Sequence, residues 1–470
     1  MSGRRITVAT ADVLGPRMAG PAIRAWHIAT ALAEEHDVRL VTTGACTLEG
    51  QGRLQVDGVD EAGLRIAANW CDVLVVQGWI LAGRPQIITT DKIIVCDVYD
   101  PMHLEQLEQG KDEGAHNWRR AVHGSTVALN EQLHRGDYFI CASEKQRDFW
   151  LGQLAALGRL NPATYAQDDT LRRLIDVVPF GTSEAPLSAD RSAVRGVLPG
   201  VDDTSKVILW GGGVYNWFDP LTLIRAVHRL HQRLPEVRLV FMGLAHPNPD
   251  ILQMRVAVQA QALAAELGLT GTVVHFNEGW VPFDQRQEFL RDADVGVSTH
   301  FDHLETEFAF RTRILDYLWA GLPIVSTAGD SFAVLIELHG AGIVVPPVDE
   351  EALELALERL LTDDELAASC RAASLALGTT FRWSEVLTPL LEFCRTAERS
   401  PDLLDDEHLR LWSHAFVVST GGGRLRNDLT TLQAYWREGG TRTVWANLER
   451  RLRRVLRLPA RTEPPGAAPR

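Results

Sequence analysis

The sequence predicts an α/β fold with two domains, each built around a parallel sheet. Its 470 residues exceed the size of one typical domain. Short apolar, β-branched runs alternate with amphipathic helical segments along most of the chain, which is the pattern of parallel strands joined by crossover helices. A charged, turn-rich segment at residues 186–204 separates two such series, and we place the boundary between the domains there.

Composition narrows the class of protein. The chain is 46% hydrophobic and 23% charged, as is usual for a globular protein, and its net charge of -14 argues against nonspecific nucleic-acid binding. The six cysteines show no CxxC or metal-ligand spacing. The N-terminus leads directly into a strand, and no apolar run reaches the ~20 residues that span a bilayer. We expect a cytoplasmic protein without a secretory signal, a bound metal or a nucleic-acid partner.

The first domain opens with the strand ITVATADV, a glycine-containing turn, an amphipathic helix and a second strand. Gly20 stands in this turn just before the helix, and glycine lets a backbone approach a ligand closely. Arg24 follows one turn into the helix, where it faces either the cleft or the solvent. A later strand, KIIVCDVYD, ends in a polar cluster that includes Asp97, Asp100 and His103. Such a cluster either contacts a ligand or serves ordinary turn and cap chemistry.

The second domain begins with the strand KVILW and three glycines, Gly211, Gly212 and Gly213. Without side chains, this turn leaves room for a phosphate, and its N–H groups can form an anion-binding nest. A tight strand-to-helix turn is the alternative interpretation. No lysine or arginine follows the glycines; Tyr215 and Asn216 stand there instead.

The most informative stretch is VSTHFDHLETEFAFRTRILDYLWAGLPIVST, residues 297–327. It reads as a strand, an acidic loop, a helix that ends at Gly321, and another strand, so the loop opens at the carboxyl end of a parallel sheet. Arg311 and Arg313 at the start of the helix suit phosphate oxygens, and the Asp316 carboxylate suits a ribose diol. The combination indicates a nucleoside diphosphate. The alternative is a solvated loop followed by an ion-paired amphipathic helix.

The segment LDYLWAGLPIV resembles the signature of retaining glycosyltransferases of the GT-B fold, especially family 4, whose common form is E-G-F-G-x-x-x-x-E-A-M-A-x-G-x-P-V-V. The resemblance implies two Rossmann-like domains whose parallel sheets face each other across a cleft. The helical tail after Pro401 departs from the family. It places Asp316 on the second glutamate, which binds the donor ribose. The first glutamate falls on Phe308, so either Glu307 or Glu305 takes its role, or the donor is held differently.

Other segments resemble the family in the same order, over roughly residues 5–395. By this resemblance, the first domain contacts the acceptor through Asp97, Asp100, His103 and Arg24. Arg311 and Arg313 replace the missing Arg/Lys pair that grips the diphosphate. The expected catalytic residues are Asp100, Glu307, Arg311 and Arg313. The expected donor-binding residues are Gly20, Gly211, Gly212, Gly213, Tyr215, Asn216, Val281, Phe308 and Asp316.

The expected organisation has five parts. They are an acceptor domain (1–185), a linker (186–204), a donor domain (205–378), a crossover helix (379–398) and a C-terminal extension (399–470). The extension carries leucines and valines at helical spacing among arginines, within residues 441–458. A basic amphipathic helix is typical of a peripheral contact with an anionic membrane, here the inner face. Docking on the protein's own acidic body or a dimer contact are the alternatives.

The function that follows is transfer of a sugar from a nucleotide-diphosphate donor to a carbohydrate or lipid-linked acceptor, with retention of anomeric configuration. The resemblance implies no cofactor and no metal, since the nucleotide-sugar is a substrate. Polysaccharide, glycolipid and natural-product glycosylation all fit. The alternatives are a sugar-nucleotide epimerase, a cyclitol transferase, or a degenerate binding and scaffold protein. The sequence leaves the sugar, the base, the acceptor and the oligomeric state open.

Overall fold

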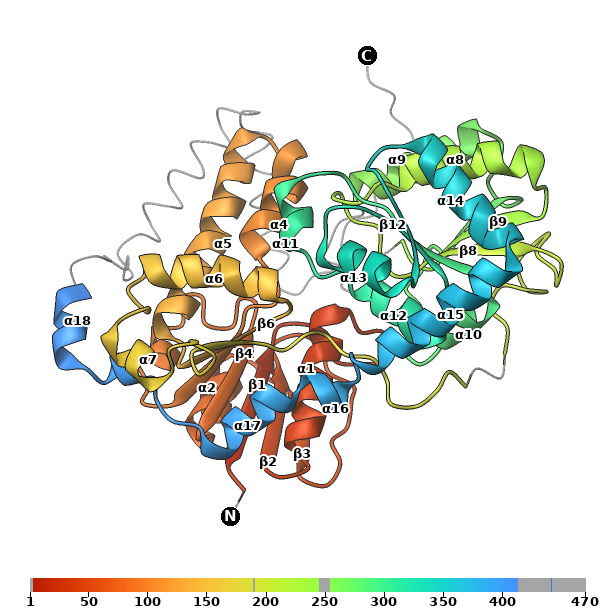
Figure 1. Cartoon of the computed structure of the whole chain (residues 1–470). Coiled ribbons are helices and arrows are strands. Elements are labelled where there is room, and N and C mark those ends of the chain that lie inside the picture. The colour runs from red at the N-terminus through yellow and green to blue at the C-terminus, as the bar shows by residue number, and fades with distance from the viewer. Residues whose placement is uncertain (1–2, 189–190, 245–253, 413–440, 442–470) are drawn as a thin grey trace. The chain divides into compact units, whose positions relative to one another are not determined.

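The computed structural model describes residues 3–188, 191–244, 254–412 and 441. It contains two sheets, one of seven strands in the order β3-β2-β1-β4-β5-β6-β7 and one of six in the order β10-β9-β8-β11-β12-β13 (Figure 1). Every pairing within these two sheets is parallel. Both sheets belong to one compact unit, which ends at His408. The prediction of two Rossmann-like domains is confirmed.

The strands of the first sheet are β1 (Arg5–Thr10), β2 (Asp37–Thr42), β3 (Leu54–Gly58), β4 (Val73–Gln77), β5 (Ile93–Asp97), β6 (Tyr138–Cys141) and β7 (Ile175–Val177). Those of the second are β8 (Lys206–Trp210), β9 (Val237–Phe241), β10 (Val274–Phe276), β11 (Val295–Ser298), β12 (Ile324–Thr327) and β13 (Gly342–Val345). Successive residues of a strand point to opposite faces of its sheet. In β8, Leu209 packs into one apolar cluster, and Ile208 and Trp210 pack into another. Helices cover both faces, which is why these strands are apolar without alternation.

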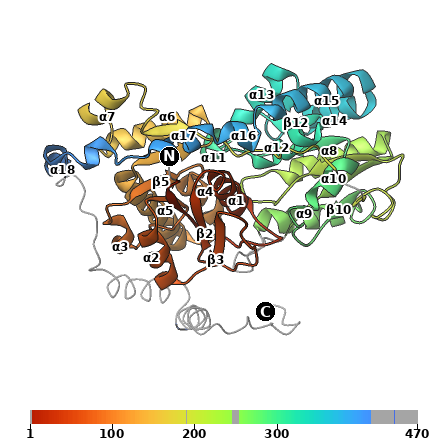
Figure 2. The ribbon, with the colours of Figure 1, turned by 90° about the horizontal axis from the view of Figure 1, so that it is seen from below.

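The helices of the first domain are α1 (Gly20–Leu32), α2 (Glu61–Trp70), α3 (Pro85–Ile88), α4 (Met102–Gln109), η1 (Gly110–Asp112), α5 (Ala115–Arg135), α6 (Glu144–Ala156) and α7 (Pro162–Gln167). Those of the second are α8 (Pro220–Arg233), α9 (Arg255–Glu266), α10 (Arg286–Asp292), α11 (Leu304–Phe308), α12 (Thr312–Ala320), α13 (Ser331–His339), α14 (Glu350–Thr362) and α15 (Asp364–Thr379). In Figure 2, α13, α14 and α15 lie together.

The segments around α12 and α8 begin and end at defined residues. Gly321 caps its C-terminus in the left-handed region, with φ 66°, where a side chain would be strained. A short helix, α11, occupies part of the loop before α12, which the sequence predicted as irregular. Further back in the chain, Asp219 caps α8 through a bond from the backbone N–H of Thr222. The three glycines therefore precede a further loop rather than running straight into a helix.

The chain returns to the first domain after α15, through α16 (Trp383–Val386) and α17 (Thr388–Thr396), followed by η2 (Pro401–Leu403) and α18 (Asp406–Trp412). Trp383 stacks on His27 of α1 with ring centroids 4.5 Å apart, and Phe393 stacks on Tyr138 of β6 at 4.1 Å. Figure 1 shows α16 beside α1. These contacts tie the end of the second domain to the first.

Across the described ranges, no helix combines the length and the hydropathy that a bilayer span requires. The basic segment 441–458 lies outside the described residues apart from residue 441, and so does most of the C-terminal tail. The prediction of a membrane-surface helix there stays a prediction.

Candidate functional site

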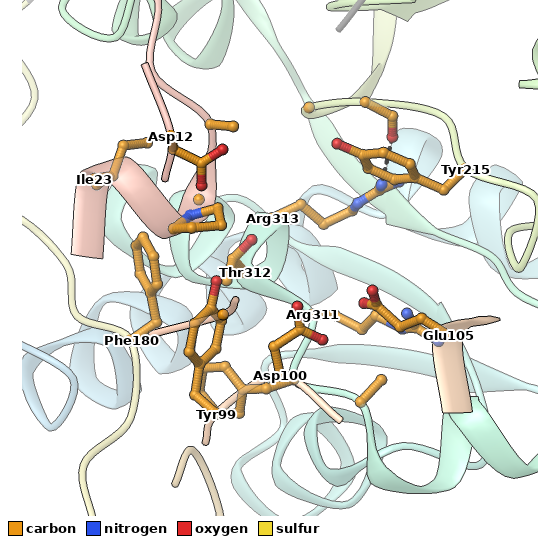
Figure 3. Close-up of a pocket in the computed structure, with 18 of the residues that line it drawn as sticks. Asp12, Ile23, Tyr99, Asp100, Glu105, Phe180, Tyr215, Arg311, Thr312 and Arg313 are labelled. Carbon is orange, nitrogen blue, oxygen red and sulfur yellow. Dashed lines mark hydrogen bonds between the residues drawn. The ribbon is translucent and has the colours of Figure 1, made fainter. Parts of the chain in front are cut away.

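A cavity of about 510 Å³ lies where the two domains meet (Figure 3). In each sheet the strand order reverses at one point, between β1 and β4 in the first and between β8 and β11 in the second. Open parallel sheets bind ligands outside the carboxyl ends of strands at such points. Asp12 and Trp79 follow the ends of β1 and β4, the turn 211–213 follows β8, and all of them line the cavity. Both switch points thus open onto the same space.

Arg313 provides the clearest binding group in this cavity. Its side chain is buried, and its Nη2 donates to the carbonyl oxygen of Gly213 at 2.7 Å. The guanidinium lies over the rings of Phe218 and Trp210, at 3.9 Å and 4.4 Å from their centroids. Its Nη1 has no hydrogen-bond partner, and no carboxylate in the described part of the chain pairs with it. Burial lowers the Arg313 pKa to about 10, because the charged form lacks water.

Arg311 also lines the cavity, but its charge is already compensated. Its two terminal nitrogens donate to the two carboxylate oxygens of Glu305, at 2.8 Å and 2.7 Å. Both side chains are buried. A forked pair of this kind holds the guanidinium in a fixed plane. We infer that Arg311 shapes the site together with Glu305 and has less charge to offer than Arg313.

The glycine turn after β8 lines the cavity, as the sequence predicted. Gly212 has φ 75°, a conformation that favours glycine, and a Cβ on Gly211 would lie 3.1 Å from the Tyr317 ring. The backbone N–H of Gly211 donates to the Tyr317 hydroxyl at 2.7 Å. The prediction of an anion-binding nest made from all three N–H groups is therefore wrong, because the Gly211 N–H already has a partner. The N–H groups of Gly212 and Gly213 remain as candidates.

Asp316 stands in the wall one turn along α12, with its side chain 21% exposed. Its Oδ1 lies 3.4 Å from Nε of Arg286, a cavity residue at the start of α10 that the sequence did not indicate. Burial raises the Asp316 pKa, and the Arg286 charge opposes this shift. Gly20, Tyr215 and Val281 also line the cavity. These predicted donor-binding residues thus border one space.

The first domain contributes carboxyl groups: Asp12, Asp100 and Glu105. Burial raises the pKa of Asp100 to about 6, while a hydrogen bond with Glu105 opposes the shift. Burial and the facing Asp100 carboxylate raise the Glu105 pKa well above its ordinary value. The two carboxyl groups therefore bind protons more tightly than isolated carboxyls do. The Asp12 pKa is also raised by burial.

Arg24 and Asp97 form a buried ion pair that holds the first domain together. Arg24 is fully buried, and its Nε and Nη2 donate to the Asp97 carboxylate at 2.6 Å and 2.9 Å. The same guanidinium donates to the carbonyl oxygens of Val178 and Pro179. The expectation that Arg24 faces the cleft is wrong. Asp97 borders the cavity, but Arg24 occupies its carboxylate, so the pair joins β5 to α1 and to the chain after β7.

His103 and Asn216 do not reach the cavity. The His103 ring packs on Phe149 and Trp150 of α6, with centroids 5.5 Å and 5.9 Å away, and burial lowers its pKa to about 4. Oδ1 of Asn216 accepts from the backbone N–H of Val256, near the start of α9. His103 and Glu105 lie on different faces of α4, and only the face with Glu105 borders the cavity. The roles predicted for both side chains are not supported by their positions.

Glu307 and Phe308 also point away from the cavity. Glu307 pairs with Lys145 at 3.0 Å, with both side chains substantially exposed. The Phe308 ring packs on Phe149, at 4.6 Å, and its carbonyl oxygen accepts from Gln146. Because residues two apart on α11 face different directions, Glu305 is the glutamate that enters the cavity. Of the two alternatives for the missing motif glutamate, the geometry favours Glu305 over Glu307.

Comparisons with known proteins agree with this geometry. A sequence model of the family described as glycosyl transferases group 1 matches residues 205–363. The D-inositol 3-phosphate glycosyltransferase of Stackebrandtia nassauensis is 28% identical over 227 residues, which cover 46% of this chain. These residues amount to 47% of the relative, so the chain spans about half the length of the curated relative it matches.

Two solved structures show the same architecture. WaaG, a glycosyltransferase involved in lipopolysaccharide biosynthesis, aligns with a TM-score of 0.59 and 17% identity, over 83% of this chain and 99% of WaaG. A UDP-forming α,α-trehalose-phosphate synthase from Burkholderia xenovorans aligns with a TM-score of 0.60 and 15% identity, over 84% of this chain and 99% of the synthase. The chain therefore has the GT-B glycosyltransferase fold, and its residues 205–363 match the glycosyl transferases group 1 family.

Proposed function

We propose that the protein transfers a sugar from a nucleoside-diphosphate donor to an acceptor hydroxyl, with retention of anomeric configuration. The observation that carries this proposal is the Arg313 guanidinium, which is buried, lines the cavity and has no carboxylate partner within the described residues. A buried charge without a counter-ion is costly, and a bound diphosphate would relieve that cost. Asp316 lies one turn further along the same helix, and we place the donor ribose beside it.

The cavity residues divide the work of such a reaction. Negative charge builds on the diphosphate as its bond to the anomeric carbon of the donor sugar breaks. Arg313 and the N–H groups of the glycine turn are fixed in place by packing, so they stabilise this charge without reorganising. The acceptor would enter from the Asp100 and Glu105 side, which belongs to the other domain. Enclosure between the two domains excludes water that would otherwise hydrolyse the donor.

UDP is the nucleotide that we propose first, because the Burkholderia xenovorans synthase is described as UDP-forming. Trp280 and Val281 border the cavity, and we place the nucleotide base beside them. The indole Nε1 of Trp280 donates to the Met18 carbonyl oxygen at 3.1 Å, which fixes the ring. Retention is supported by the resemblance of the α12 segment to retaining enzymes.

The test uses the full chain with UDP-glucose and GDP-mannose, each with a panel of sugar and polyol acceptors. The proposal predicts release of the nucleoside diphosphate together with a new glycoside, whose anomeric proton coupling matches that of the donor. A coupling that shows the opposite anomeric configuration would contradict retention but would leave the proposed sugar transfer standing. Nucleotide binding without any transfer would favour the scaffold alternative, and formation of an epimeric sugar nucleotide would favour the epimerase.

We also propose, from the sequence, that the natural acceptor belongs to polysaccharide, glycolipid or natural-product glycosylation, and that residues 441–458 contact anionic lipid. Each arginine near such a surface contributes about 1 kcal/mol. Deleting residues 441–470 should abolish sedimentation with phosphatidylserine vesicles while leaving nucleotide binding unchanged. Persistent sedimentation of the shortened protein, or none with the full chain, would contradict this contact.

A further inference from the structure

The acceptor side of the cavity has an uneven distribution of charge. Asp12, Asp100 and Glu105 line it from the first domain. Among the described residues that line the cavity, the cationic side chains are Arg286, Arg311 and Arg313, and all three come from the second domain. The first-domain wall thus carries acids without a facing base of its own.

Those three arginines are already assigned. Arg311 is neutralised by Glu305, to which it donates a forked pair of hydrogen bonds, and Arg286 lies 3.4 Å from the Asp316 carboxylate. Arg313 is the group that meets the donor diphosphate in the function proposed above. A second phosphate, on the acceptor, would therefore find no uncommitted cation in the described wall. It would also face the Asp100 carboxylate, and a pair of like charges in such a place costs several kcal/mol.

A second feature indicates what the wall does accept. Ser125 on α5 is 1% exposed and lines the cavity, yet its Oγ has no hydrogen-bond partner among the described residues. Oδ1 of Asp100 is likewise without a partner. Unsatisfied buried groups are rare in native proteins, and a bound hydroxyl or amine would satisfy both.

Three glutamines, Gln106, Gln109 and Gln132, line the cavity as Ser125 does. The side-chain amide of Gln132 donates to the Gly78 carbonyl oxygen at 2.7 Å. Gln106 donates to Oε1 of Gln109 at 3.1 Å, which leaves the Gln106 carbonyl and the Gln109 amide nitrogen available to a ligand. The neighbouring Trp79 is 45% exposed and offers an apolar face. Amides beside an aromatic ring suit the hydroxyl groups and C–H faces of a polyol ring.

We propose that the acceptor is a polyol without phosphate, and that it presents hydroxyl or protonated amino groups to Asp100, Glu105 and Ser125. This inference rests on the proposed function for its assignment of Arg313. It separates the chain from its relative named for D-inositol 3-phosphate, an acceptor that carries a phosphate. Hydroxyl and amino groups both donate hydrogen bonds to carboxylates. The experiment below distinguishes an acceptor with an amino group from a neutral one.

The experiment compares matched probes on the full chain by calorimetry, with and without saturating UDP. The probes are glucose, glucosamine and glucose 6-phosphate, and myo-inositol with its 3-phosphate. We expect the unphosphorylated members to bind at least about ten-fold more tightly than their phosphates, because the acids repel the added charge. Glucosamine binding more tightly than glucose identifies an amine-bearing acceptor, and equal binding identifies a neutral one.

Two variants test whether the acidic side chains cause the preference against phosphorylated probes. In Asp100→Asn/Glu105→Gln the preference against phosphate should shrink at least about five-fold, because the repulsion is removed. Asp169→Asn, at an exposed site away from the cavity, should keep the full preference. Phosphates that bind as tightly as their parents, or a panel in which no member binds at millimolar concentration, would overturn the inference. Failure of UDP and GDP to bind would instead overturn the proposed function, and the UDP-free titrations would still decide the acceptor charge.

Discussion

The Arg313 guanidinium donates to the carbonyl oxygen of Gly213 across 2.7 Å and so joins α12 to the turn that follows β8. These residues stand a hundred positions apart in the chain. The bond uses one terminal nitrogen, and the other, Nη1, has no hydrogen-bond partner among the residues that the structure describes. The glycine turn and the helix start therefore form one site, in which a cation is held beside backbone N–H groups. Our functional account depends on this juxtaposition.

Arg313→Met should leave the folded protein at least as stable as the wild type. The substitution removes a buried charge that has no carboxylate partner, and methionine can fill much of the space between Trp210 and Phe218. The Gly213 carbonyl keeps a bond from Trp210 Nε1 at 3.3 Å. Urea unfolding should give a free energy within about 1 kcal/mol of wild type, or above it. A loss of about 3 kcal/mol or more would assign Arg313 a structural role.

Asp316→Ala should weaken UDP binding by about ten- to a hundred-fold, which corresponds to hydrogen bonds to a charged group. The loss should disappear for 2′,3′-dideoxy-UDP, because that nucleotide has no diol for the carboxylate to bind. Competition calorimetry with both nucleotides measures the difference. An equal loss for the two nucleotides would show that Asp316 acts through Arg286, its neighbour at 3.4 Å, and not through the ribose.

Asp97→Asn should destabilise the protein by about 3–5 kcal/mol, because it leaves the fully buried Arg24 without a counter-charge. Arg24→Met/Asp97→Leu should lose less than the sum of the two single changes. A matched control is the forked pair between Arg395 and Glu35, which has the same geometry but is exposed. Glu35→Gln should unfold close to wild type, since solvent screens that pair. Wild-type unfolding of Asp97→Asn would contradict the role assigned to Arg24.

The Asp100 carboxyl should make stability depend on pH in a defined direction. Folding raises its pKa from 3.8 to about 6, so the folded state binds the proton more tightly than the unfolded chain does. This contribution is fully present below pH 3.8 and is lost as pH rises through about 6. Relative to the wild type, Asp100→Asn should gain up to about 3 kcal/mol between pH 4 and pH 7. Parallel stability profiles of the two proteins across this range would contradict the shift.

The fold and the second-domain site could be predicted from the sequence because their signals are local. Short apolar strands, the glycine turn and the α12 segment each lie within a few neighbouring residues. Gly20, Gly211, Tyr215, Arg313 and Asp316 all reach the cavity as predicted.

Other assignments, such as those of Arg24 and Glu307, failed because they depended on which way a side chain faces in the tertiary structure. Arg24 and Asp97 are far apart in sequence and pair only in the folded core, which no local pattern reveals. Glu305 and Glu307 are two residues apart on a short helix, yet of these two only Glu305 lines the cavity. Glu105 could have been found, since it lies on the helix after Asp100. Arg286 gave no signal, because its partner Asp316 comes from another helix.

The affinity of the full chain for UDP, measured by calorimetry on the wild type and on Arg313→Met, tests the central claim most directly. Arg65→Met, an exposed site, is the control. The account predicts binding to the wild type and to the control with equal affinity, and a loss of about ten- to a hundred-fold in Arg313→Met. Equal affinity in all three proteins, or no binding of UDP or GDP to the wild type, would contradict it.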